Sequence, residues 1–129
     1  MGNVSREREL TPAQHKELVG LLTEKRDDLR SALKTRRSGA SADARTGDEA
    51  DQASEDAGVA LETRLMDRDA KLLREVERAL KKVSDETYGY CEGTDEPIGY
   101  ARLKLRPWTR YSVTYKEELE REARRQGGN

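Results

Sequence analysis

The chain has 129 residues, of which 40% are charged and 33% are apolar, and it contains no phenylalanine. This composition supplies too little apolar material for a thick globular core, so it favours an elongated molecule with a narrow apolar seam. The 25 basic and 26 acidic residues leave a net charge of −1, which excludes the strongly basic surface of a protein that grips duplex DNA by its phosphates.

The single cysteine, Cys91, excludes an intrachain disulfide and suits a reducing compartment. No apolar run approaches the length needed to span a bilayer, and the first residues lack the apolar core of a signal peptide. We therefore expect a cytoplasmic protein without a membrane partner.

The first predicted helix starts at Thr11, and residues 1–10 before it are expected to form a flexible N-terminus. Thr11 and Gln14 have the spacing of a capping box, and Pro12 suits the first helical position. Apolar residues then recur at intervals of three and four, which predicts an amphipathic helix that ends near Arg37. Its apolar stripe consists of Leu18, Leu21, Leu22, Leu29, Ala32 and Leu33.

A small, polar segment at residues 38–47 predicts a loop, and a longer amphipathic helix follows from Asp48 to about Asp85, with a length of ~57 Å. So thin a stripe on so long a helix must pack against another element, and the first helix is the nearest along the chain. Residues 11–85 are therefore predicted to form an antiparallel coiled-coil hairpin with its tip near residues 38–53. The regular stripe argues against disorder, the alternative interpretation of so polar a chain. Its members are Ala50, Ala53, Ala57, Leu61, Leu65, Leu72, Val76, Leu80 and Val83.

Residues 86–129 are predicted to form a small globular head, so that the whole fold is mainly α. The head would comprise a turn at residues 93–97, a short strand-like apolar run at residues 98–105 and a final helix at residues 115–126. We expect Cys91 to be a small buried side chain rather than a redox sensor, and His15 to be a solvated surface residue. The expected head core consists of Tyr88, Tyr90, Ile98, Leu103, Leu105, Trp108, Tyr111, Val113 and Tyr115.

Two segments of the chain indicate a protein family, which the composition alone does not. The stretch LKKVSDETYGYCEGTDEPIGYARLKLRP at residues 80–107, preceded by DEADQA at residues 48–53 and a long charged helix, resembles the DksA/TraR family of bacterial RNA polymerase-binding factors. The resemblance runs from about residue 18 to residue 116. It implies a hairpin that enters the secondary channel of RNA polymerase, places its tip near the active centre and alters the stability of promoter complexes, often together with the alarmone ppGpp.

The resemblance also implies roles for residues of the hairpin. Asp48, Asp51 and Ala53 fall on the family's functional tip, and we expect them to act near the polymerase active centre. Acids at this position also cap the free N–H groups of a helix and favour its dipole, and the two roles are compatible. Arg64 and Arg68, one turn apart in LETRLMDRD, match basic shaft positions of the family and are expected to contact the polymerase.

Three further positions match the ppGpp-binding residues of the family, namely Leu72, Arg106 and Lys116. Glu75, however, stands where well-studied members use a lysine, and an acid repels a polyphosphate. The sequence therefore leaves ppGpp binding undecided.

Zinc-binding members of the family hold a structural ion with two Cys-x-x-Cys pairs. The corresponding positions here are Cys91, Thr94, Ser112 and Tyr115, so three of the four thiols are absent. We expect a head without zinc or another cofactor, in which the ring of Tyr115 fills the volume that a metal would organise.

The sequence thus predicts a monomeric, zinc-independent transcription regulator that binds RNA polymerase, has no enzymatic activity and reads no DNA sequence. Two alternatives stay open. Asp48 and Asp51 could hold a second Mg²⁺ ion, as the tip carboxylates of Gre-like transcript-cleavage factors do. The hairpin could also serve as a coiled-coil adaptor or a self-associating structural protein.

Overall fold

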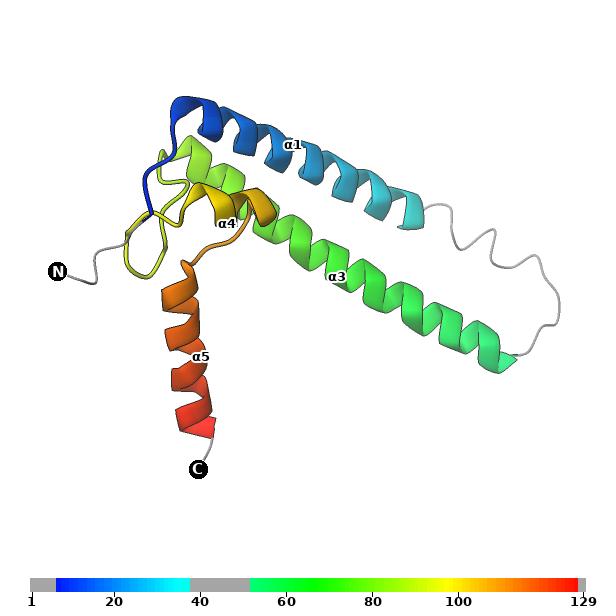
Figure 1. Cartoon of the computed structure of the whole chain (residues 1–129). Helices are drawn as coiled ribbons and strands as arrows, with labels where there is room; N and C mark the ends of the chain where they lie inside the picture. Colours follow the sequence, from blue (N-terminus) through cyan, green and yellow to red (C-terminus); the bar gives the residue numbers. More distant parts are fainter. Residues whose placement is uncertain (1–6, 38–51, 128–129) are drawn as a thin grey trace.

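The computed structural model describes residues 7–37 and 52–127, with the side chains of the second range from residue 55 onward. A shaft of two antiparallel helices carries a small head at one end (Figure 1). The shaft consists of α1 (Pro12–Thr35) and α3 (Gln52–Ser84), and the head contains α4 (Tyr100–Leu105) and α5 (Val113–Gly127). The predicted mainly α fold with a hairpin and a small head is confirmed.

The start of α1 has the predicted capping box. The backbone N–H of Gln14 donates to Oγ1 of Thr11 at 3.1 Å, and the N–H of Thr11 donates to Oε1 of Gln14 at 3.0 Å. Pro12, which has no N–H, occupies the first turn, so the helix starts with few unsatisfied donors. The apolar stripe of α1 faces α3 and buries Leu18, Leu22, Leu29 and Leu33.

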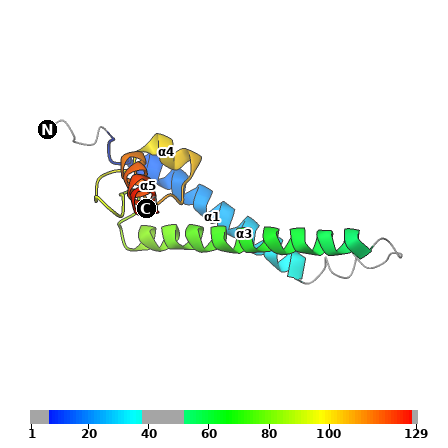
Figure 2. The ribbon, with the colours of Figure 1, turned by 90° about the horizontal axis from the view of Figure 1, so that it is seen from below.

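The stripe of α3 packs on α1 mainly through its C-terminal half, where Val76 and Ala79 are buried. The seam predicted along the whole helix is wrong at its outer end, where Leu61 is 50% exposed. The reason is length: α1 has 24 residues and α3 has 33, so the outer part of α3 extends past the described end of α1 (Figures 1 and 2). No described helix is both long and apolar enough to cross a membrane.

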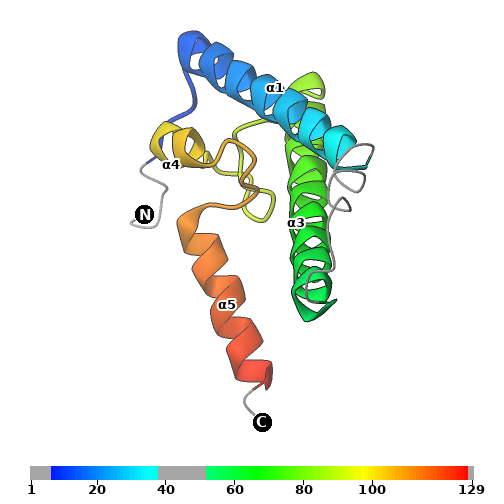
Figure 3. The same cartoon turned by 90° about the vertical axis from the view of Figure 1, so that its right-hand side faces the viewer.

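The head gathers around the base of the shaft, and α4 packs against α1. Helix α5 projects from the head and stands apart from α1 and α3 (Figures 1 and 3). None of its side chains is fully buried. The final helix predicted for residues 115–126 is confirmed, with two further residues at its start and one at its end.

The strand-like run predicted at residues 98–105 is wrong, because residues 100–105 form helix α4. Gly99, with φ of +105°, precedes the helix in a backbone conformation that favours glycine. In a strand Leu103 and Leu105 would share a face, whereas in a helix they lie about 200° apart. Leu103 is accordingly buried and Leu105 is 83% exposed, so Leu105 is not part of the head core.

Other predictions about buried and exposed side chains had mixed outcomes. Tyr88 and Ile98 are buried as predicted. Val113, predicted in the core, is 49% exposed because it starts the projecting helix α5. His15, predicted as a solvated surface residue, is half-buried with its ring edge-on to Tyr88 at a centroid distance of 5.8 Å.

Candidate functional site

A narrow backbone loop at residues 89–98 forms the frame of the head. The N–H of Cys91 donates to the carbonyl of Glu96 at 2.8 Å, and the N–H of Asp95 donates back to the carbonyl of Cys91 at 2.8 Å. Tyr90 and Pro97 form an isolated antiparallel bridge beside them. The loop therefore turns back on itself directly after Cys91, as a metal-binding turn would.

The structure brings the four degenerate zinc positions together around the thiol of Cys91. The Thr94 side chain and the backbone groups of Ser112, Gly93 and Thr94 hydrogen-bond to this thiol, and Oγ of Ser112 accepts the N–H of Tyr115 at 3.2 Å. Cys91 is fully buried, as predicted. Burial works to raise the pKa of the Cys91 thiol, but the hydrogen bonds outweigh burial and lower the pKa below its ordinary value.

The donors at these positions do not fit a structural zinc ion. Tetrahedral zinc takes four ligands, mostly thiolates and imidazoles, whereas this site offers one thiol, two hydroxyls and a phenol ring. The Tyr115 ring packs so closely on Gly93 that a Cβ at that glycine would overlap it. In the part of the chain that the structure describes, no three His, Cys, Asp or Glu residues form a group able to hold a metal.

Next to Cys91 lies an ion cluster that the sequence analysis missed. The Glu92 carboxylate contacts Nε of Arg78 at 3.2 Å, Nζ of Lys82 at 3.4 Å and the guanidinium of Arg110 at 3.0 Å. We call these four residues the Glu92 cluster. The sequence did hold a sign of this cluster. Arg78 and Lys82 are like charges one helical turn apart, and such a pair is unfavourable unless an acid lies nearby.

The Glu92 cluster is partly withdrawn from solvent, with the Glu92 side chain 22% exposed and that of Lys82 16% exposed. Burial works to raise the pKa of the Glu92 carboxyl. The hydrogen bonds from Arg110 and Arg78 and the charges of Lys82 and Arg110 outweigh it, and they lower this pKa to about 2. Glu92 is therefore ionised throughout the physiological pH range.

A second ion cluster lies on the shaft, where the buried Asp69 interrupts the apolar stripe of α3. Nη1 of Arg36, at the end of α1, lies 2.6 Å from Oδ2 of Asp69, and Nε of Arg36 lies 3.1 Å from Oε2 of Glu62. This pair joins the described end of α1 to one position on α3. It spans 33 residues in sequence, so helical periodicity alone could not predict it.

The predicted tip falls mostly outside the described residues. Asp48 and Asp51 lie outside them, and Ala53 is the second residue of α3, with its side chain outside the description. Arg64 and Arg68 both lie exposed on α3, one turn apart as predicted. Arg68 is 3.6 Å from Asp69, and its side chain is 70% exposed, so its charge is available to a partner.

The three predicted ppGpp positions lie on three different elements. Leu72 is half-buried against the core, Arg106 is exposed at the end of α4, and Lys116 is exposed in the first turn of α5. No hydrogen bond or ion pair joins them among residues 7–37 and 52–127. Glu75, the residue that argues against ppGpp, is half-buried and acts electrostatically on Arg110.

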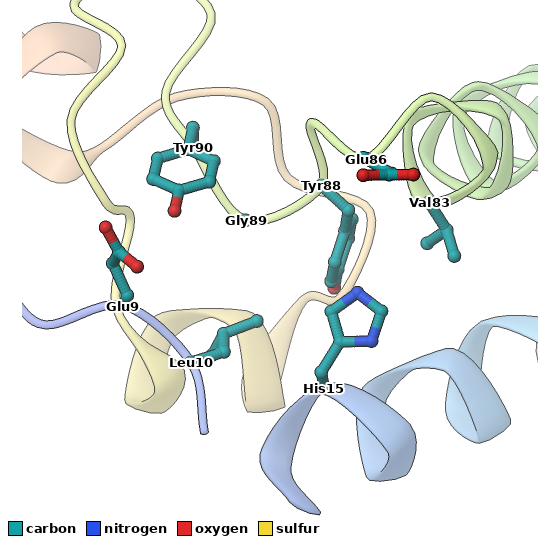
Figure 4. Close-up of a pocket in the computed structure, with 8 residues that line it drawn as sticks. All are labelled: Glu9, Leu10, His15, Val83, Glu86, Tyr88, Gly89 and Tyr90. Atoms are coloured by element: carbon teal, nitrogen blue, oxygen red, sulfur yellow. The ribbon is translucent and has the colours of Figure 1, made fainter. Parts of the chain in front are cut away.

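A pocket of about 240 Å³ lies at the base of the shaft. Its walls come from the segment before α1, the first turn of α1, the end of α3 and the head loop, and Tyr90 faces Glu9 across one side (Figure 4). Buried beside it, the hydroxyl of Tyr88 donates to the carbonyl of Pro107 at 2.8 Å, and burial raises the pKa of Tyr88. The contact between Tyr90 and Glu9 joins the N-terminal segment to the head, and the bond between Tyr88 and Pro107 joins two parts of the head.

The fold and the head together define a class of protein: a two-helix shaft that carries a head built on a zinc-finger frame. Residues 14–83 match the family described as the N-terminal domain of the DnaK suppressor protein DksA. Residues 86–121 match the family described as the prokaryotic dksA/traR C4-type zinc finger. The chain belongs to the DksA/TraR family, which confirms the resemblance stated from its sequence.

Individual relatives support this assignment. The structure of transcription factor DksA2 from Pseudomonas aeruginosa matches with a TM-score of 0.76 and 34% identity, covering 88% of each chain. The RNA polymerase-binding transcription factor DksA of Caulobacter vibrioides is 49% identical over 77 residues, which are 60% of this chain and 54% of that protein. The protein of the same name from Escherichia coli K12 is 45% identical over 60 residues, 46% of this chain and 40% of that protein. The chain thus spans about half the length of the curated relatives it matches.

Proposed function

We propose that this protein is a transcription regulator that binds RNA polymerase through the secondary channel and alters the stability of promoter complexes. The observation that carries the proposal is the hairpin shaft, found in a chain whose curated relatives are named RNA polymerase-binding transcription factors. The shaft is slender, because each helix is only about 10–12 Å across, and α3 is roughly 50 Å long over its 33 residues. A shape of this kind suits entry into a narrow protein channel.

In this proposal the hairpin tip acts near the polymerase active centre through Asp48, Asp51 and Ala53, and Arg64 and Arg68 contact the channel wall. The exposure of both arginines is consistent with that role. The protein acts by binding, without enzymatic activity, as a cytoplasmic monomer that reads no DNA sequence.

The head works without zinc in this proposal, because the residues at the four metal positions include one thiol and no imidazole. ppGpp as a co-effector would use Leu72, Arg106 and Lys116. The acid at Glu75 is expected to weaken any such binding.

The test is in vitro transcription from a ribosomal promoter, with and without ppGpp, using the wild-type chain and Asp51→Asn. We expect the wild type to change promoter output, and Asp51→Asn to compete for polymerase binding while losing that effect. An adaptor would leave transcription unchanged in both forms. Shortening of the RNA in stalled elongation complexes that depends on Asp48 and Asp51 would instead identify a cleavage factor.

A further inference from the structure

The head has to join two loops that a metal ion would otherwise hold together. One loop carries Cys91 and Thr94, and the other carries Ser112 and Tyr115, which are the positions equivalent to the two ligand pairs. Of the hydrogen bonds to the Cys91 thiol, only the one from the Ser112 backbone connects the two loops, because the others come from Gly93 and Thr94 on the same loop. A stronger connection lies one residue away, at Glu92.

Glu92 joins the same two loops twice. Its backbone N–H donates to the carbonyl of Arg110 at 2.9 Å, and Nε of Arg110 donates to Oε1 of its carboxylate at 3.0 Å. The second of these bonds, between the guanidinium and the carboxylate, is charge-assisted, and such bonds are about twice as strong as neutral ones. The main chain and side chain of a single residue therefore hold the second loop against the first.

Glu92 also fastens both loops to the shaft. Arg78 reaches both oxygens of the carboxylate from α3, with Nε at 3.2 Å and Nη2 at 3.3 Å. Lys82, one turn further along α3, contacts the carboxylate at 3.4 Å and donates to the carbonyl of Tyr90 at 3.3 Å. Three elements that are distant in sequence thus meet at one carboxylate.

The stability of the Glu92 cluster depends on the negative charge of the Glu92 carboxylate. Three cations contact the Glu92 carboxylate, and Glu75 also acts electrostatically on Arg110, so the attraction common to all three cations depends on the charge of Glu92. If that charge is removed, Arg78, Lys82 and Arg110 repel one another at close range. A shallow groove lined by Arg78, Lys81, Lys82, Asp85, Thr87 and Glu92 opens the cluster to solvent, so salt can screen it.

We propose that Glu92 is an electrostatic cross-link that takes the place of the metal in this head: it binds the two former ligand loops to each other and both to α3. In a metal-bound head the cross-link is a cation held by anionic thiolates. Here the polarity is inverted, with an anion held by cationic side chains. The head should therefore respond to salt in a way that packing alone does not predict.

The test is native-state hydrogen exchange on Glu92→Gln, measured residue by residue by NMR. The amides of Cys91, Asp95 and Ile98 report on the head loop because each donates a hydrogen bond within it. We expect these amides to exchange faster by about tenfold in Glu92→Gln, a typical effect of removing a charged hydrogen-bond partner. The shaft amides of Leu22 and Val76 should keep their rates, which would show that only the head opens.

The decisive observation is the sign of the salt effect. Between 0.05 and 1 M NaCl, exchange in the wild-type head should become faster, because salt weakens an attractive cluster. In Glu92→Gln it should become slower, because salt then screens repulsion among three cations. The matched control is Asp85→Asn, which removes from the same groove a carboxylate that pairs with Lys81 at 3.3 Å and not with the Glu92 cluster.

Unchanged head exchange in Glu92→Gln, equal acceleration in Asp85→Asn, or the same sign of the salt effect in wild type and variant would each overturn the proposal. If Glu92→Gln does not fold, Arg110→Gln replaces it, since it breaks the side-chain link between the loops and leaves the Glu92 carboxylate paired with Arg78 and Lys82. These measurements need no polymerase, so they test the cross-link independently of the proposed function.

Discussion

The ion pair between Arg36 and Asp69 allows a prediction in which the two partners behave unequally. Asp69 is buried, with its side chain 11% exposed, whereas the side chain of Arg36 is 24% exposed and has a second partner in Glu62. Arg36→Gln would leave the buried Asp69 carboxylate with the exposed Arg68, 3.6 Å away, as its remaining ion-pair partner among the described residues. Asp69→Leu would instead fill a seam position with an apolar side chain, and Arg36 would keep Glu62.

The magnitudes follow from burial. An unsatisfied buried polar group costs about 1–3 kcal/mol, and the loss of one partner of a fully buried ion pair costs about 3–5 kcal/mol. Because this pair is only partly buried, we expect Arg36→Gln to lower the free energy of unfolding by about 2 kcal/mol. Asp69→Leu should change it by less than about 1 kcal/mol in either direction, since hydrophobic replacement of buried ion pairs is often neutral or stabilising.

The assay is urea unfolding followed by circular dichroism at 222 nm. With a slope of about 1–3 kcal/mol per molar urea, Arg36→Gln should lower the midpoint by roughly 1 M. The control is Arg30→Gln, which breaks an exposed pair with Glu77 at 2.8 Å and should cost less than about 1 kcal/mol. Equal destabilisation by Arg36→Gln and Asp69→Leu would refute the reasoning, because it would mean that the cost comes from the pair and not from a stranded charge.

Three further predictions concern the head. Tyr115→Ala should expose the Cys91 thiol and speed its labelling by a thiol reagent by about tenfold or more. Tyr115→Phe keeps the ring over Gly93 and should be labelled at the wild-type rate. Equal labelling rates in all three proteins would contradict this packing role of Tyr115. The folded-state pKa of Glu92, about 2, lies below the ordinary 4.5, so its stabilisation is complete above about pH 4.5 and is lost as pH falls towards 2. The protection factors of the head amides, which correct for the intrinsic pH dependence of exchange, should fall over that window in the wild type. The same fall in Glu92→Gln would argue against this role of Glu92. Incubation with a chelator should leave the helical signal and the emission of Trp108 unchanged, and a loss of either would contradict a head without zinc.

Local patterns predicted the shaft well because helices depend on local contacts. The structure has the predicted capping box at Thr11. It also buries the predicted apolar stripe, which recurs at helical spacing through Leu18, Leu22 and Leu29. The error at residues 98–105 has a physical cause as well. An apolar run of that length suits either a strand or a short helix, and only the packing of Leu103 decides between them.

For the candidate site, the sequence alone determined that the thiolate and imidazole ligands of a structural zinc ion are too few. With one cysteine and one histidine the chain cannot form a structural zinc site made only of thiolates and imidazoles, so the prediction of a head without zinc needs no coordinates. Only the tertiary structure shows the ion clusters, including the Glu92 cluster that we propose takes the metal's place. Glu92 meets Arg110 across 18 residues and Arg78 across 14, and Arg36 meets Asp69 across 33. Contacts between charges so far apart in sequence depend on how the chain folds back on itself, and no local periodicity encodes them.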